Sequence, residues 1–215
     1  MMVWRKTFRT LLLRSSLVLL LVGCSTLTTK EPLSEDPEAV DREELEGAWV
    51  LNDQVYQVRF REDGVARIGH LAWENDEFFF LKGEMIITEG RLHNFLSIRG
   101  FGDGEWMDEY LLLGYTILTD GNLLLWVPDV DRFEELVAEG RLEGIIDPED
   151  SRFGSDLMLT TPPAELLEFL NDPENEDLFD DRPPNEYREI FGDPENPDRV
   201  ADLDPVILRK VTEND

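Results

Sequence analysis

Alternation of apolar and polar side chains dominates the middle of the chain and predicts β-strands. Tyr56, Val58 and Phe60 share one side of a run over residues 55–61, and polar residues fill the other side, as in a strand with one buried face. Asp63-Gly64, a hairpin turn signal, ends this run. Similar runs predict strands over residues 47–51, 55–61, 65–73, 78–82, 84–88, 92–99, 110–118 and 123–127.

Apolar spacing changes after residue 128 and predicts two short helices. Their stripes recur at helical spacing, namely Phe133, Leu136 and Val137 in the first helix and Leu166, Phe169 and Leu170 in the second. Asp129 or Asp131 can cap the first helix, and Gly140 can end it. Thr161-Pro162 can open the second, with Thr161 as its cap. Shorter strands are expected over residues 141–146, 156–160 and 206–211.

Short strands joined by turns predict a mainly β domain over residues 45–215. We expect an antiparallel meander that closes into a small barrel or sandwich, decorated by the two helices. Asp, Glu, Asn and Pro dominate residues 171–204, which we expect to be an irregular acidic segment.

Gly47-Ala48-Trp49 opens the first expected strand. This Gly-x-Trp sequence resembles the opening signature of lipocalin-like barrels, a fold that also occurs in bacterial lipoproteins of unknown function. The resemblance implies that Trp49 plugs one end of a barrel. It also implies that a basic residue from the closing strand, Arg209 or Lys210, packs on the indole ring.

The N-terminus carries a basic stretch followed by an apolar one, the layout of a secretory signal. It ends in Leu21-Val22-Gly23-Cys24, which resembles the lipobox of bacterial lipoprotein precursors. The resemblance implies that residues 1–23 are a signal peptide and that Cys24 is acylated, for example with palmitate. The protein would then be anchored in the cell envelope. Ser25 follows the cysteine, which favours the outer membrane, facing the periplasm. Residues 24–44 are expected to form a tether with a span of roughly 25 Å.

Charge narrows the classes of partner. The formal net charge is −28, and all 48 acidic residues follow Cys24. Such a field repels nucleic acid and anionic lipid surfaces. Cys24 is the only cysteine, so no disulfide within the chain is expected.

Aromatic residues are the best candidates for a ligand site, and the expected binding residues are Trp73, Phe78, Phe80 and Trp106. If they line a barrel mouth, the cavity should measure several hundred cubic ångströms and accept a fatty-acid or retinoid-like molecule. The alternative is that these rings fill the core.

No metal or cofactor is expected. His70 and His93 lack the spacing of a metal site. Asp172-Pro173-Glu174-Asn175, which recurs at residues 193–196, is ordinary turn chemistry without the ligand ladder of an EF-hand.

The leading functional hypothesis is a membrane-anchored envelope lipoprotein that acts as a non-catalytic binding or envelope-maintenance module, with an apolar small molecule as ligand. One alternative is a scaffold whose acidic C-terminal segment engages a basic protein. A hydrolase with paired carboxylates is the other alternative, although no spacing singles out a pair.

Overall fold

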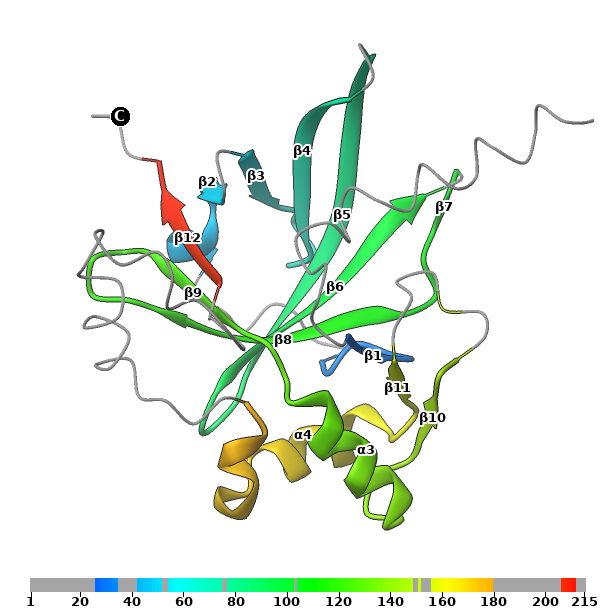
Figure 1. Ribbon diagram of the computed structural model, residues 1–215. Helices are drawn as coiled ribbons and strands as arrows, with labels where there is room; N and C mark the ends of the chain where they lie inside the picture. Colours follow the sequence, from blue (N-terminus) through cyan, green and yellow to red (C-terminus); the bar gives the residue numbers. More distant parts are fainter. Residues whose placement is uncertain are drawn as a thin grey trace, which may run out of the picture.

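Eight antiparallel strands form a closed barrel in the computed structural model (Figure 1). The structure describes residues 26–34, 42–51, 54–74, 77–102, 104–148, 151, 156–179 and 206–211. The barrel strands are β2 (Gly47–Leu51), β3 (Gln54–Phe60), β4 (Ala66–Glu74), β5 (Glu77–Glu89), β6 (Asn94–Gly102), β8 (Tyr110–Ile117), β9 (Leu123–Trp126) and β12 (Val206–Lys210). β12 pairs with both β9 and β2 and thereby closes the meander. The mainly β, antiparallel barrel expected from the sequence is confirmed.

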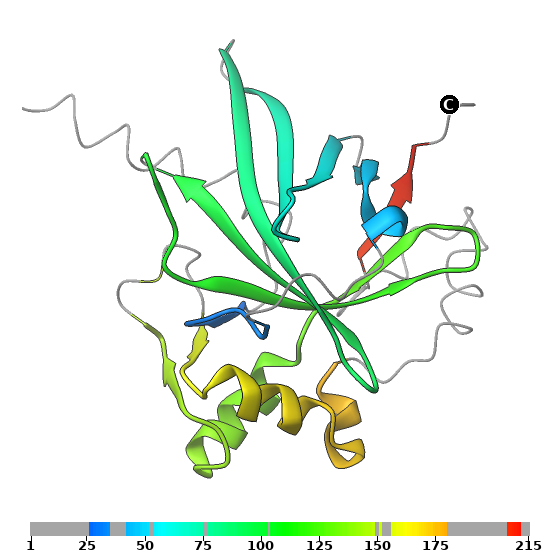
Figure 2. The ribbon, with the colours of Figure 1, turned by 180° about the vertical axis from the view of Figure 1, so that it is seen from behind.

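A second layer covers the outer wall of the barrel beneath β8 (Figures 1 and 2). It consists of β1 (Leu27–Thr29), α3 (Val130–Ala138), β10 (Gly144–Ile146), β11 (Leu157–Leu159), α4 (Pro163–Leu170) and the 3-10 helix η3 (Pro173–Leu178). The one-turn helix α2 (Arg42–Leu45) precedes β2, and the short strand β7 (Glu105–Trp106) pairs with β6. No helix in the described ranges is long and apolar enough to cross a membrane.

Strand alternation divides the apolar side chains between two cores. Inward-facing residues of the barrel form one cluster around Trp49, Leu96 and Leu113. Outward-facing residues of β6, β8 and β9 form the other cluster with α3 and α4, and Phe133 is completely buried there. Both helical stripes expected from the sequence contribute to this outer core.

The helix ends follow local backbone chemistry. The side chain of Asp129 accepts a hydrogen bond from the Arg132 amide and caps α3. Gly140 ends the helix in the left-handed region, at φ 72°. The predicted Thr161 cap is wrong, because Pro162 precedes α4 and makes no side-chain cap. The Thr161 hydroxyl instead accepts a hydrogen bond from the Glu143 amide, at 2.7 Å, and ties α4 to the β10 segment.

Part of the expected tether is packed against the domain. β1 pairs with β8 and, in parallel, with β11, and Leu27 and Leu33 are buried. Glu109, which is 5% exposed, accepts hydrogen bonds from the hydroxyls of Thr28 and Ser151. Residues 26–34 therefore belong to the folded body, and the free link between Cys24 and this body is shorter than expected.

Candidate functional site

An apolar cavity of about 150 Å³ lies inside the barrel. Its walls are the inward-facing side chains of all eight barrel strands together with two residues that precede or follow a strand. They are Leu45, Trp49, Leu51, Tyr56, Val58, Ile68, Met85, Leu96, Ile98, Leu111, Leu113, Leu123, Leu125, Val127 and Leu208. Because the period of a strand is two residues, one face of each strand supplies all of these side chains. The cavity is thus a consequence of the alternation in the sequence.

One end of the cavity is closed by Trp49 and Leu45. Both residues are almost fully buried, and the indole Nε1 of Trp49 donates to the Leu45 carbonyl at 2.9 Å. The Lys210 ammonium lies 5.3 Å from the Trp49 ring centroid and donates to the carbonyls of Glu43 and Glu44. These contacts hold α2 across the end of the barrel.

The basic partner of Trp49 is therefore Lys210 rather than Arg209. Lys210 is the cross-strand partner of Trp49, whereas Arg209 pairs with Val50 and is exposed. Alternation places the two neighbouring side chains on opposite faces of β12. Of the two partners left open by the sequence, the structure selects the one on the inner face.

The opposite end of the cavity is its more open side. Leu51, Ile98, Leu111, Leu125 and Val127 are half-buried there, in contrast to the buried side chains near Trp49. The cavity is therefore a cup whose floor is Trp49 and whose rim is aliphatic. Such a cup can take an apolar group from one direction only.

Polar atoms next to the cavity are paired within the wall. The Tyr56 hydroxyl donates to the Gln54 side chain at 2.8 Å, and burial raises the pKa of Tyr56 to about 12. The His70 ring stacks on Tyr56, and its Nδ1 donates to the Val55 carbonyl at 3.0 Å. His93 packs among Phe95, Trp126 and Phe179 in the outer core. Within the described ranges, no group of acidic, histidine and cysteine side chains is suited to hold a metal ion.

Two of the four aromatic residues expected to bind ligand, Phe80 and Trp106, do not line this cavity. Phe80 lies on the outer face of β5, opposite Leu71, and is 68% exposed. Trp106 belongs to β7, outside the barrel, and packs against Phe101 with ring centroids 5.1 Å apart. The side chains of Trp73 and Phe78 lie outside the described residues, as does Cys24. Aliphatic side chains provide most of the lining instead.

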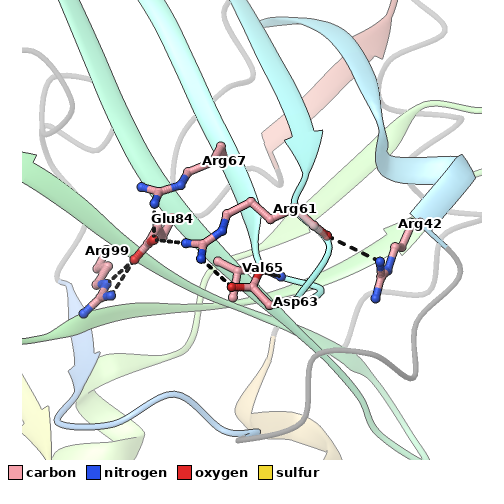
Figure 3. Close-up of polar contacts among 7 residues, drawn as sticks. All are labelled: Arg42, Arg61, Asp63, Val65, Arg67, Glu84 and Arg99. Atoms are coloured by element: carbon pink, nitrogen blue, oxygen red, sulfur yellow. Dashed lines mark hydrogen bonds and ion pairs between the residues drawn. The ribbon is translucent and has the colours of Figure 1, made fainter.

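A network of three arginines surrounds one buried carboxylate on the outer wall (Figure 3). Glu84 on β5 is 4% exposed, and Arg67 and Arg99 are its cross-strand partners on β4 and β6. Arg99 donates through Nε and Nη2 to Glu84 Oε2, at 2.8 and 2.5 Å. Arg67 and Arg61 donate to Oε1, at 2.9 and 3.3 Å.

Trp106 covers part of this network. The guanidinium carbons of Arg67 and Arg99 lie 4.7 and 5.3 Å from its ring centroid. The Lys82 ammonium lies 3.4 Å from the Phe101 ring centroid beside it. Glu84 and the aromatic rings thus bring four basic side chains, those of Arg61, Arg67, Arg99 and Lys82, together on the outer face of β3–β6. The sequence analysis did not predict this cluster. The alternation of side chains places Arg59, Arg61 and Arg67 on the outward face of the barrel, and this could have indicated it.

Comparison with protein families, with curated proteins and with solved structures found no match to this chain.

Proposed function

We propose that the chain is a lipid-anchored lipoprotein of the bacterial cell envelope whose lipocalin-like barrel is a non-catalytic binding module for a small apolar ligand. The observation that carries this proposal is the apolar cup above Trp49. Convergent aliphatic side chains around a preformed concave space are the usual basis of small-molecule binding. Because the Tyr56 hydroxyl and the His70 Nδ1 are paired within the wall, the cup offers little to a polar guest.

The volume limits the class of ligand. A space of about 150 Å³ equals that of an engineered aliphatic cavity that stays dry and binds benzene. A fatty acid or retinoid, as the sequence suggested, would exceed it. The fitting ligand is a six-carbon ring or a short alkyl chain, for which each buried methylene contributes about 0.8 kcal/mol.

Toluene is a suitable probe of the cup. At about ten times its Kd it should add about 1.4 kcal/mol of stability, which raises the Tm by about 3 to 6 °C. Leu125→Phe places a larger side chain at the half-buried rim and should abolish this shift. The matched control is Leu71→Phe on the exposed outer face of β4, which should leave the shift intact.

Differential scanning fluorimetry at several toluene concentrations makes this measurement. A saturable shift that persists in Leu125→Phe and disappears in Leu71→Phe would place the ligand outside the barrel and contradict the proposal. So would a wild-type Tm that does not respond to toluene.

The anchor in this proposal rests on the lipobox-like Leu21-Val22-Gly23-Cys24 sequence. Thr26 is already held by the domain, since its amide donates to Asp156 at 2.8 Å. Two peptide steps span at most about 7 Å, so an acyl chain on Cys24 would begin next to the start of β1. The domain would then lie close to the bilayer surface instead of being separated from it by a long tether.

Cys24→Ala should remove membrane attachment. The wild-type protein should gain the mass of acyl chains at Cys24 and partition into the detergent phase, because two or more chains give stable anchoring. The variant should partition into the aqueous phase after its signal segment is removed. Equal detergent partitioning of both proteins, without an acyl mass on the wild type, would exclude the anchor. Density-gradient fractionation then distinguishes the outer membrane, which we propose, from the inner membrane.

A further inference from the structure

The outer face of β4 and β5 carries an exposed apolar pair, because the described second layer lies beneath β8 (Figures 1 and 2). Leu71 and Phe80 are cross-strand partners on this face and are 59% and 68% exposed. A Cβ atom at Gly69 would lie 3.0 Å from the Phe80 ring, so the ring rests on the backbone of that glycine. Adjacent exposed apolar side chains of this size are typical of interaction surfaces.

The arginine network continues this apolar pair along the same two strands (Figure 3). Arg67 and Glu84 are cross-strand partners four residues before Leu71 and four residues after Phe80. At about 3.4 Å per residue, the two rows are about 14 Å apart. Lys82 lies between them on the outward side of β5. A single extended segment of about five residues is therefore long enough to contact both rows.

The cations of this face are held in place and still have donors to offer. Arg67 is 40% exposed and contacts Glu84 through Nη2 at 2.9 Å, which leaves other N–H groups of the guanidinium for an external acceptor. The Lys82 ammonium lies 3.4 and 5.7 Å from the ring centroids of Phe101 and Trp106, and no carboxylate of the described ranges pairs with it. Groups fixed before binding lose less conformational entropy when a partner arrives.

We propose that this face binds an extended segment of a partner protein that has acidic residues at one end and apolar residues at the other. Its carboxylates would pair with Arg67 and Lys82, and its apolar side chains would pack on Leu71 and Phe80. Aromatic residues and arginine are the types enriched where interfaces concentrate their binding energy. The surface is additional to the apolar cup and the anchor and depends on neither of them.

The charge of the whole chain favours a peptide segment over an anionic bilayer. The formal net charge is −28, and a bilayer would present its negative charge to a whole side of the protein. The charges of a short peptide act mainly within a Debye length, about 8 Å at physiological salt. The peptide therefore interacts with Arg67 and Lys82 and little with the acidic residues elsewhere.

Fluorescence anisotropy with a designed peptide tests this surface on the full chain. The fluorescein-labelled probe has a pair of glutamates that precedes a leucine–phenylalanine pair by four residues. Two matched peptides replace either the glutamates with glutamine or the apolar pair with serine. The probe should bind saturably and at least tenfold more tightly than either matched peptide. Its affinity should also fall in 1 M salt, where the Debye length is about 3 Å.

Lys82→Gln and Phe80→Ser should each weaken binding of the probe by about fivefold to tenfold, the effect of losing one substantial interface contact. Arg132→Gln on α3 and Ile145→Ser on β10 are the matched controls, because they remove an exposed basic and an exposed apolar side chain from the second layer. Both controls should bind like the wild type. All four changes are at exposed side chains, so an unchanged Tm is expected and shows that each variant folds.

Several results would overturn the peptide site. They are an absence of binding up to millimolar concentration, equal affinity for the three peptides, affinity that salt does not change, and unchanged affinity in both Lys82→Gln and Phe80→Ser. Displacement of the probe by toluene would place the peptide in the apolar cup instead. Preference of the Cys24→Ala protein for phosphatidylglycerol vesicles over the probe would assign the face to a bilayer.

Discussion

Trp49→Ala is expected to lower the free energy of unfolding by about 3 to 5 kcal/mol, the range for removing a large buried aromatic side chain. Trp49 is 1% exposed and forms the floor of the apolar cup. Its loss would enlarge the cup and leave the Leu45 carbonyl without the indole donor. The closed end of the barrel would then lose one of the contacts that hold α2 in place.

Urea unfolding followed by far-ultraviolet circular dichroism measures this loss. Trp106→Ala, which removes a half-buried indole on the outer face, is the matched control and should cost less than half as much. Lys210→Met in both backgrounds isolates the cation–π contact, whose coupling should be about 0.5 to 2 kcal/mol. Additivity of the two changes within about 0.5 kcal/mol would remove that contact from the explanation.

Glu84→Gln is expected to cost about 3 kcal/mol, the lower end of the range for removing one partner of a buried ion pair. The substitution keeps the size of the side chain but leaves Arg61, Arg67 and Arg99 close together without the carboxylate between them. Their guanidinium groups retain access to water. The expected loss of free energy of unfolding is therefore at the lower end of the range for a buried ion pair.

Urea is the appropriate denaturant for this measurement, because guanidinium chloride screens ion pairs. Glu135→Gln is the matched control, since it removes an exposed partner of Arg132 on α3. Exposed pairs contribute about 0 to 1 kcal/mol. If Glu84→Gln costs no more than Glu135→Gln, Glu84 does not organise the outer wall.

Local sequence chemistry was sufficient to predict most of the fold. Alternation over residues 55–61 matches β3, and its inward residues Tyr56 and Val58 are buried. The hairpin signal Asp63-Gly64 does join β3 to β4, with Gly64 at φ 82°. Periodicity and turn chemistry are local properties, so a single sequence can reveal them.

The residues that line the cavity were harder to predict, because the direction of a side chain depends on the register of its strand. Phe78, Phe79 and Phe80 are consecutive, so they cannot all face inward in one strand. The gap expected between strands 78–82 and 84–88 does not exist. Gly83 continues the single strand β5, paired with Ile68 and Gly100. Only this pairing shows that Phe80 faces outward.

Long-range pairing also explains why strand β1 in the N-terminal segment could not be predicted from the sequence. Leu27-Thr28-Thr29 is too short to signal a strand by itself. It becomes one because β8 and β11 offer it partners from far along the chain.

Methyl NMR of methionine tests the central claim, which is that the barrel interior is an accessible apolar binding site. Met85 lines the cup, whereas Met107 and Met158 lie outside it. With ¹³C-methyl methionine labelling, titration with toluene should shift the Met85 signal saturably and leave those of Met107 and Met158 in place. An unchanged Met85 signal, or equal shifts of all three methyl groups, would contradict a ligand site inside the barrel.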